Sequence, residues 1–152
     1  MANGLDVIIL DDERQIAEHL KDLTETFYSW GQVHAFSDAL EARTFCFNRE
    51  SSLAIFVLDM FLGGQTAFDF IEAVTIHYPM AAEDSVIITG HAGNDIVNMC
   101  MAAGVTHLLE KPIKPYAYQF AVRAIANKYL RFAKKLMHDP ELAGDVARMA
   151  LW

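Results

Sequence analysis

The sequence has little that would suit an exported or membrane-spanning protein. It contains two cysteines, Cys46 and Cys100, and its longest apolar runs are about six residues, against the roughly 20 that cross a bilayer. The chain opens with Met1-Ala2-Asn3-Gly4, without a basic region followed by an apolar stretch. We therefore expect no export, no membrane contact, a cytoplasmic location and two reduced core thiols rather than a disulfide.

Positive charge is also scarce. The chain has 12 Lys and Arg against 20 Asp and Glu, which gives a formal net charge of −8. Such a field repels nucleic acid and anionic membrane surfaces, and it favours Mg²⁺. Segments rich in Pro, Gly or Ser are absent, and 53% of the 152 residues are hydrophobic, so we expect one folded domain.

Short apolar runs alternate with segments of helical period, which is typical of βα units around a parallel sheet. The runs predict strands at about 6–10, 32–36, 53–58, 85–88 and 105–109, with helices at about 14–28, 37–48, 66–78, 94–103 and 116–137. The fold class predicted is α/β: a flavodoxin-like, doubly wound, five-stranded parallel sheet in the order 2-1-3-4-5 with five helices.

Local signals predict several helix ends. Ser37 is suited to cap the second helix, Thr66 and Asp69 have the spacing of a capping box, and Gly104 suits the left-handed position after a helix. Asp139-Pro140-Glu141 predicts a further helix start. We therefore divide the chain into a domain at 1–137 and a C-terminal helical extension at 138–152.

Four predicted strands end on polar residues that are able to handle a phosphate. Asp11 and Asp12 follow the first strand, Asp59 the third, Thr89 the fourth and Lys111 the fifth. The carboxyl ends of parallel strands meet at one edge of the sheet, where ligands bind in open α/β folds. The sequence therefore predicts one site with three acids, a hydroxyl and an ammonium group.

This set has a definite chemistry. Three neighbouring carboxylates repel one another unless a cation intervenes, and Mg²⁺ prefers oxygen ligands. An Asp can attack phosphorus and hold an acyl phosphate, while fixed positive charge and hydroxyl donors stabilise the transferring group. We expect a magnesium-dependent phosphoacceptor site.

The same residues resemble a known family. The pieces Leu10-Asp11-Asp12-Glu13, Val57-Leu58-Asp59, Ile88-Thr89-Gly90-His91 and Gly104 through Lys111-Pro112 are similar to the receiver domains of bacterial two-component response regulators. The resemblance covers residues 5 to about 133. No piece is specific alone, but the combination is.

The resemblance implies a role for each site residue. Asp59 would be phosphorylated by a histidine kinase or phosphotransfer protein, with Thr89 and Lys111 contacting the phosphoryl oxygens. Mg²⁺ would be held by Asp59, directly by Asp12, mostly through water by Asp11, and by the main-chain carbonyl of Phe61. The domain would be no enzyme beyond its own phosphoryl uptake and loss, and would act on a downstream protein target rather than on nucleic acid.

Four positions depart from the family or vary within it. Gly63 stands where many members have Pro, and Leu108 stands where many have an inward-turning aromatic residue. Phe61 and His91 occupy the two variable positions that modulate loss of the phosphoryl group in the family. We expect the bulky Phe61 to hinder the hydrolytic water.

Other interpretations stay open. A phosphorylation-independent scaffold of the same fold is one, and a magnesium-dependent phosphatase of the haloacid dehalogenase type is another. That phosphatase family needs its nucleophile and a second Asp two residues apart, whereas here the two Asp residues, Asp11 and Asp12, are adjacent and residue 13 is Glu. The chain is either a single-domain regulator or part of a longer protein.

The last two helices also allow alternatives. The final long helix carries a basic face, which is either solvated or pairs with acids across a homodimer: Arg123, Lys128, Arg131, Lys134 and Lys135. The extension carries an apolar stripe, which either folds back on its own domain or joins a second copy: Leu142, Val146, Met149, Ala150 and Trp152.

Overall fold

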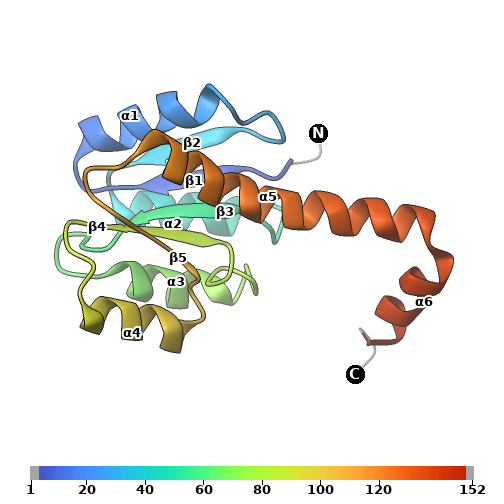
Figure 1. Cartoon of the computed structure of the whole chain (residues 1–152). Helices are drawn as coiled ribbons and strands as arrows, with labels where there is room; N and C mark the ends of the chain where they lie inside the picture. Colours follow the sequence, from blue (N-terminus) through green and yellow to red (C-terminus); the bar gives the residue numbers. More distant parts are fainter. Residues whose placement is uncertain (1–3, 150–152) are drawn as a thin grey trace.

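The structure, a computed structural model, describes residues 4–149. Its centre is a parallel sheet of five strands in the order β2-β1-β3-β4-β5, as predicted (Figure 1). The strands are β1 (Val7–Leu10), β2 (Val33–Phe36), β3 (Ile55–Asp59), β4 (Ser85–Thr89) and β5 (His107–Glu110). The helices are α1 (Arg14–Glu25), α2 (Ala39–Asn48), α3 (Ala67–Thr75), α4 (Asn94–Ala103), α5 (Pro115–His138) and α6 (Pro140–Met149).

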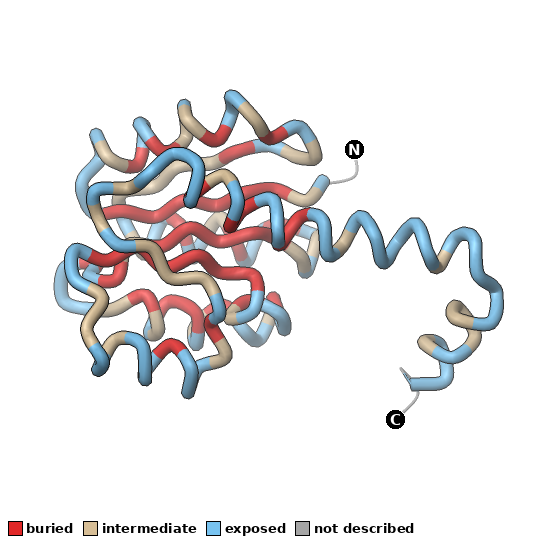
Figure 2. Tube along the Cα trace, in the orientation of Figure 1, coloured by how far each residue is buried: buried red, intermediate tan, exposed pale blue. Residues whose placement is uncertain are grey.

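Helices cover both faces of the sheet, so the central strands are buried along their length (Figure 2). Alternate residues of β1 and β3 point to opposite faces, because side chains in a strand alternate. Ile8 and Phe56 pack under α2, α3 and α4, whereas Val7 and Val57 pack under α1 and α5. This packing aligns the carboxyl ends of β1, β3 and β4 at one edge.

Two of the predicted helix ends are confirmed and one is wrong. Thr66 and Asp69 form the capping box of α3, and Gly104 ends α4 with a positive φ of 83°. The cap of α2 is Asp38 rather than Ser37, since the Asp38 carboxylate accepts a hydrogen bond of 3.0 Å from the Glu41 amide. A carboxylate and a hydroxyl are both good caps, and only the backbone path selects between neighbours.

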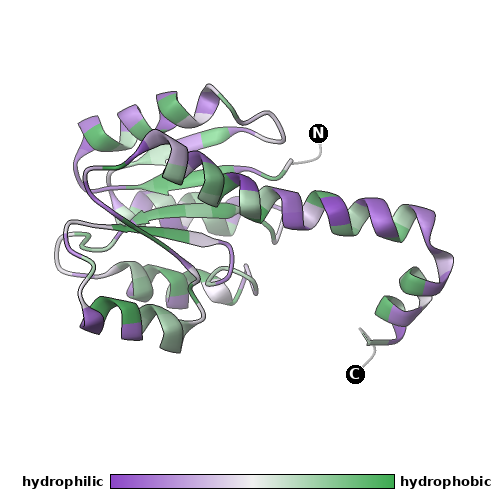
Figure 3. Ribbon diagram, in the orientation of Figure 1, coloured by the Kyte–Doolittle hydropathy of each residue, from purple (hydrophilic) through white to green (hydrophobic). Residues whose placement is uncertain are grey.

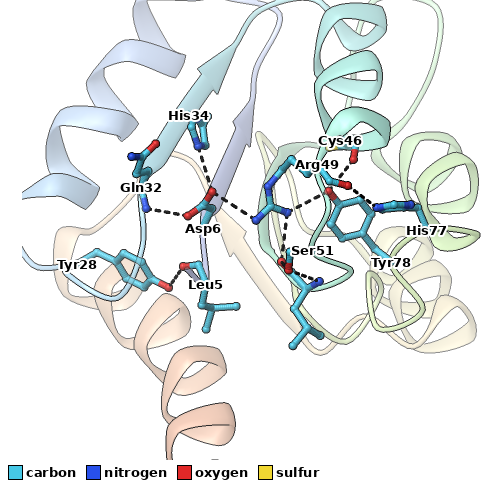
Figure 4. A network of polar contacts seen from close by, with 11 residues as sticks. Leu5, Asp6, Tyr28, Gln32, His34, Cys46, Arg49, Ser51, His77 and Tyr78 are labelled. Atoms are coloured by element: carbon cyan, nitrogen blue, oxygen red, sulfur yellow. Dashed lines mark hydrogen bonds and ion pairs between the residues drawn. The ribbon is translucent and has the colours of Figure 1, made fainter. Parts of the chain in front are cut away.

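A buried polar network lies at the amino-terminal ends of the strands, opposite the end that carries the predicted site (Figure 4). Arg49, between α2 and β3, donates to the Asp6 carboxylate at 3.3 Å and to the Tyr78 hydroxyl at 3.0 Å. Asp6 also lies 3.3 Å from His34. The network ties together loops that lead into neighbouring strands, and nothing in the sequence pattern predicted it.

The carboxy-terminal half of α5 leaves the domain as an arm (Figure 1). The buried residues of α5 lie between Tyr118 and Ala126, and none of the described residues of α6 is buried. Asp139 separates the two helices and caps α6 by accepting a 3.0 Å hydrogen bond from the Leu142 amide, as its sequence predicts. The division at residue 137 stays a prediction, and Ala150 and Trp152 lie outside the described residues.

Within residues 4–149, no helix combines the length and the apolar character that a membrane span requires.

Candidate functional site

Asp11 and Asp12 follow β1 directly, and the backbone fixes Asp11 in place. Its amide donates to the Phe36 carbonyl at 3.1 Å, and its Oδ1 accepts from the Glu13 amide at 2.9 Å. Asp11 is buried, and its Oδ2 has no hydrogen-bond partner among the described residues, whereas Asp12 is exposed. A buried carboxylate oxygen without a hydrogen bond is costly, and a cation would satisfy it.

Asp59 is the last residue of β3, which pairs with β1 and therefore brings it to the same edge. Asp11, Asp12 and Asp59 each offer one carboxylate oxygen, and these oxygens lie within 4.8 Å of one another. An all-oxygen donor set of this size suits Mg²⁺, which needs one or two carboxylates and keeps several waters. Three of the four residues predicted as metal ligands are thus brought together.

Lys111 supplies positive charge to the three acids. It lies in the turn after β5, where its amide donates to the Thr89 carbonyl at 2.8 Å and its peptide bond to Pro112 is cis. Its Nζ lies 3.3 Å from Oδ1 of Asp59 and 3.8 Å from Oδ2 of Asp11. The ammonium group therefore faces the acids, as the sequence predicted.

Thr89 ends β4 on the same edge. Register places Asp59 opposite Ile88, so Thr89 lies one residue beyond Asp59 along the edge. Its hydroxyl donates to the His91 carbonyl at 3.2 Å and makes no hydrogen bond with Asp59. The hydroxyl is thus close to the acids but engaged elsewhere, and contact with a phosphoryl group would require it to change partner.

The electrostatics of the pocket are unfavourable for three free carboxylates. Burial raises the pKa of Asp59 to about 6, with a further increase from the charge of Asp11, and the nearby Lys111 opposes the shift only in part. Burial also raises the pKa of Asp11, against the lowering effects of the Glu13 amide and Lys111. A divalent cation would remove this conflict, which supports the metal assignment.

Phe61 and His91 flank the site at its exposed side. They line one surface hollow together with Thr89 and Gly90, and the Phe61 ring is 61% exposed. Phe61 forms an isolated bridge with Thr66 in the loop after β3. Its main-chain carbonyl as a metal ligand stays a prediction.

One residue at this edge had no predicted role. Glu110, the last residue of β5, accepts a hydrogen bond of 2.7 Å from the Ala92 amide and lies 4.0 Å from the His91 ring. It ties the loop after β4 to β5. Its position directly before Lys111 is the only signal in the sequence that could have suggested this contact.

The fold is shared with many solved receiver domains. A response regulator receiver domain protein from Clostridium thermocellum superposes with a TM-score of 0.72 at 22% identity, over 87% of this chain and 99% of that one. This chain has the receiver-domain fold. Two further receivers match: the BeF3-activated DrrB receiver domain (TM-score 0.67, 16% identity, 84% of this chain and 99% of that one) and the Vibrio cholerae chemotaxis protein CheY4 (0.67, 20%, 82% and 98%).

The proteins similar to this chain in sequence are response regulators, and those similar in structure are receiver domains. The resemblance noted in the sequence is therefore confirmed. The two-component response regulator PprB of Pseudomonas aeruginosa is 27% identical over 113 residues, and the transcriptional regulatory protein GltR of the same organism is 26% identical over 129. These matches cover 72% and 84% of this chain but only 39% and 51% of the relatives, so the chain spans about two fifths to one half of their length. No family model matches the chain.

Proposed function

We propose that the chain is the phosphoacceptor switch of a two-component phosphorelay. In this proposal Asp59 accepts a phosphoryl group from a histidine kinase or a phosphotransfer protein in a Mg²⁺-dependent reaction. Phosphorylation changes the surface that the domain offers to a downstream protein. The two free cysteines, both buried, fit a reducing cytoplasm.

One observation carries the proposal: the Lys111 ammonium lies 3.3 Å from Asp59, which shares a 4.8 Å cluster of oxygens with Asp11 and Asp12. A metal site alone would not need the ammonium group. A structural ion pair alone would not need three acids, one of them with a buried oxygen that has no hydrogen bond among the described residues. Together they suit a dianionic phosphoryl group, with three equatorial oxygens, held between a metal and a lysine.

The residues of the chain divide the reaction between them. An Asp59 oxygen attacks phosphorus and forms an O–P bond, while the P–N bond of the donor phosphohistidine breaks and its electron pair stays on the imidazole. Asp11, Asp12 and Asp59 would hold Mg²⁺, which offsets charge on the equatorial oxygens. Lys111 stabilises one of these oxygens as a fixed positive charge, and Thr89 offers its hydroxyl to another.

The decisive experiment uses acetyl phosphate, Mg²⁺ and intact-mass spectrometry. We expect the wild-type chain to gain one phosphoryl group, and we expect no gain for Asp59→Asn or for wild type in EDTA. The control Asp69→Asn alters an acid of the α3 cap and should leave the mass gain intact.

The same experiment separates the alternatives. An unmodified wild-type chain that still binds its partner would support a phosphorylation-independent scaffold and reject the proposal. Steady release of phosphate from several unrelated phosphomonoesters would support a phosphatase.

A further inference from the structure

The apolar stripe by which α5 packs on the sheet continues beyond the sheet. Tyr118, Val122 and Ile125 are buried under the receiver fold. The same alternating spacing of four and three residues continues on the arm with Tyr129, Phe132 and Leu136. Phe132 is 45% exposed, so the stripe runs from the core into solvent.

The arm has two unlike flanks. On one side of the stripe lie basic residues: Lys128, Arg131 and Lys135. On the other side lie apolar ones: Leu130, Ala133 and Met137. Figure 3 shows the hydrophilic and hydrophobic positions alternating along the arm. Residues 127–138 contain no acid, although the whole chain carries −8.

Helix α6 has the complementary pattern. Its stripe is Leu142, Val146 and Met149, and Met149 is 72% exposed. The flank that corresponds to the basic flank of α5 carries Glu141, Asp145 and Arg148, of which Asp145 and Arg148 pair with each other. The other flank carries Ala143 and Ala147. An amphipathic helix of 10 residues is marginal in water without a partner.

Complementarity selects one arrangement. When two helices pack antiparallel through their apolar stripes, the flank on a given side of the stripe of one helix lies against the flank on the same side of the other. An antiparallel pair of α5 and α6 therefore places the basic flank against the acidic one and the small apolar flanks together, whereas two α5 arms would place basic residues against basic ones. The lengths also agree, since 12 and 10 helical residues span about 18 Å and about 15 Å.

The connection prevents α6 from pairing in this way with its own α5. Only Asp139 separates the helices, and an antiparallel helical hairpin needs a loop of about two to five residues. Figure 1 shows α6 leaving the end of α5 at an angle. The α6 that covers an arm must therefore come from another molecule.

Contacts with the receiver fold hold the arm where it leaves the sheet. Where α5 leaves the sheet, Lys128 forms a 2.5 Å ion pair with the buried Asp84, and the Tyr129 hydroxyl donates to the other Asp84 oxygen. These contacts set the direction in which the arm projects. A preset direction lowers the entropic cost of pairing two arms.

We propose that the chain forms a two-fold homodimer in which α6 of each copy lies antiparallel on the α5 arm of the other. The four helices make a small bundle beyond the two receiver folds. The active-site edges stay free, and the dimer forms without phosphorylation.

The first test is analytical ultracentrifugation of the full chain, without acetyl phosphate, across micromolar concentrations. We expect a dimer of the wild type, and a dimer dissociation constant at least about tenfold higher for Phe132→Asp. Phe120→Asp is the matched control, because Phe120 is 78% exposed on the part of α5 that covers the sheet. A monomeric wild type, or a dimer that Phe120→Asp weakens as much as Phe132→Asp, would overturn the proposal.

The second test shows whether the contact is between copies. One variant combines Glu141→Lys with Asp145→Lys, and the other combines Arg131→Glu with Lys135→Glu. Each alone should be mostly monomeric, because like charges then face each other in both contacts. Their mixture should form a heterodimer, in which both contacts again join opposite charges. A mixture that stays monomeric would contradict the exchange of α6 between copies.

Discussion

The Nζ of Lys111 lies 3.3 Å from Oδ1 of Asp59, although Asp59 is the last residue of β3 and Lys111 lies in the turn after β5. This contact joins the group of three carboxylates, Asp11, Asp12 and Asp59, to the ammonium group of Lys111. A phosphoryl group on Asp59, rather than on Asp11 or Asp12, would therefore lie between a metal ion and the Lys111 ammonium.

Replacing this ammonium should slow phosphoryl uptake. Lys111→Met removes the positive charge that faces the equatorial oxygens, so we expect the rate of phosphorylation by acetyl phosphate to fall at least about tenfold. Rates are measured by intact mass in excess Mg²⁺. Lys114→Met, three residues away in the chain, should leave the rate within a factor of about two. A similar loss in both variants would show a general charge effect.

Asp59 should destabilise the metal-free protein at neutral pH. Its folded-state pKa of about 6 exceeds the ordinary 3.8, so the folded chain binds this proton more tightly than the unfolded chain. The contribution of the protonated Asp59 to folding stability is fully present below pH 3.8 and is lost as the pH rises through 6. Asp59→Asn should therefore be more stable than wild type by about 3 kcal/mol at pH 8 and equal to it at pH 3.

Urea titrations in EDTA measure this difference, and Mg²⁺ should narrow it at pH 8 by stabilising only the wild type. Asp22→Asn, an exposed acid on α1, serves as the control and should change little at either pH. Equal stability of Asp59→Asn and wild type at pH 8 would mean that the three acids do not strain the fold.

Phe61 should protect the phosphorylated state. Phe61 is exposed and lines the hollow beside Thr89, and we expect its ring to hinder the approach of water to Asp59. In Phe61→Asn we expect the half-life of the aspartyl phosphate, in buffer with Mg²⁺, to shorten severalfold. Leu40→Asn changes an equally exposed apolar residue on α2 and should leave the decay as in wild type. An unchanged decay in Phe61→Asn would defeat the idea.

Asp84 should contribute strongly to folding stability. Its carboxylate is 1% exposed and binds both Lys128 and Tyr129, so Asp84→Ala leaves their polar groups without a buried partner. We expect a loss of about 3 kcal/mol in the free energy of unfolding, measured with urea. Asp145→Ala removes an exposed ion pair with Arg148 and should cost less than about 0.5 kcal/mol. Comparable losses would contradict the burial argument.

The two thiols should be unreactive in the folded chain. Burial raises the pKa of Cys46 to about 12, and it also raises the pKa of Cys100, so little thiolate exists at pH 8. Iodoacetamide should modify neither residue in native buffer and both in urea, as followed by intact mass. Rapid labelling of either thiol in the native chain would show that its burial is transient.

Periodicity predicted the strands and the helices, because their patterns are local and strong in this chain, and the flavodoxin-like fold class supplied the strand order. Boundaries were less exact: α1 ends at Glu25 rather than near residue 28, and α3 ends at Thr75 rather than near 78. Both ends continue as hydrogen-bonded turns, for example from the Tyr78 amide to the Val74 carbonyl at 2.8 Å. The apolar pattern continues through such turns, so it does not mark where the helix ends.

The predicted site residues were found together because strand ends in a parallel sheet are fixed by topology. Asp11, Asp12, Asp59, Thr89 and Lys111 could all be placed at one edge once five strands were recognised. Glu110 and the network of Asp6, Arg49 and Tyr78 were not predicted. Their contacts join loops that are distant in the chain, and the spacing of residues in the sequence does not predict contacts between distant loops.

The sequence by itself determined which side chains lie at the carboxyl ends of the strands, because hydrogen bonding between parallel strands brings these ends to one edge of the sheet. Only the tertiary structure decided how those groups meet: Asp11 is buried, with one oxygen that has no hydrogen bond among the described residues, Asp12 is exposed, and the Lys111 ammonium faces Asp59. It also decided that α6 stays off its own domain. Such distances and exposures depend on loop paths and packing, which are properties of the whole fold rather than of any local pattern.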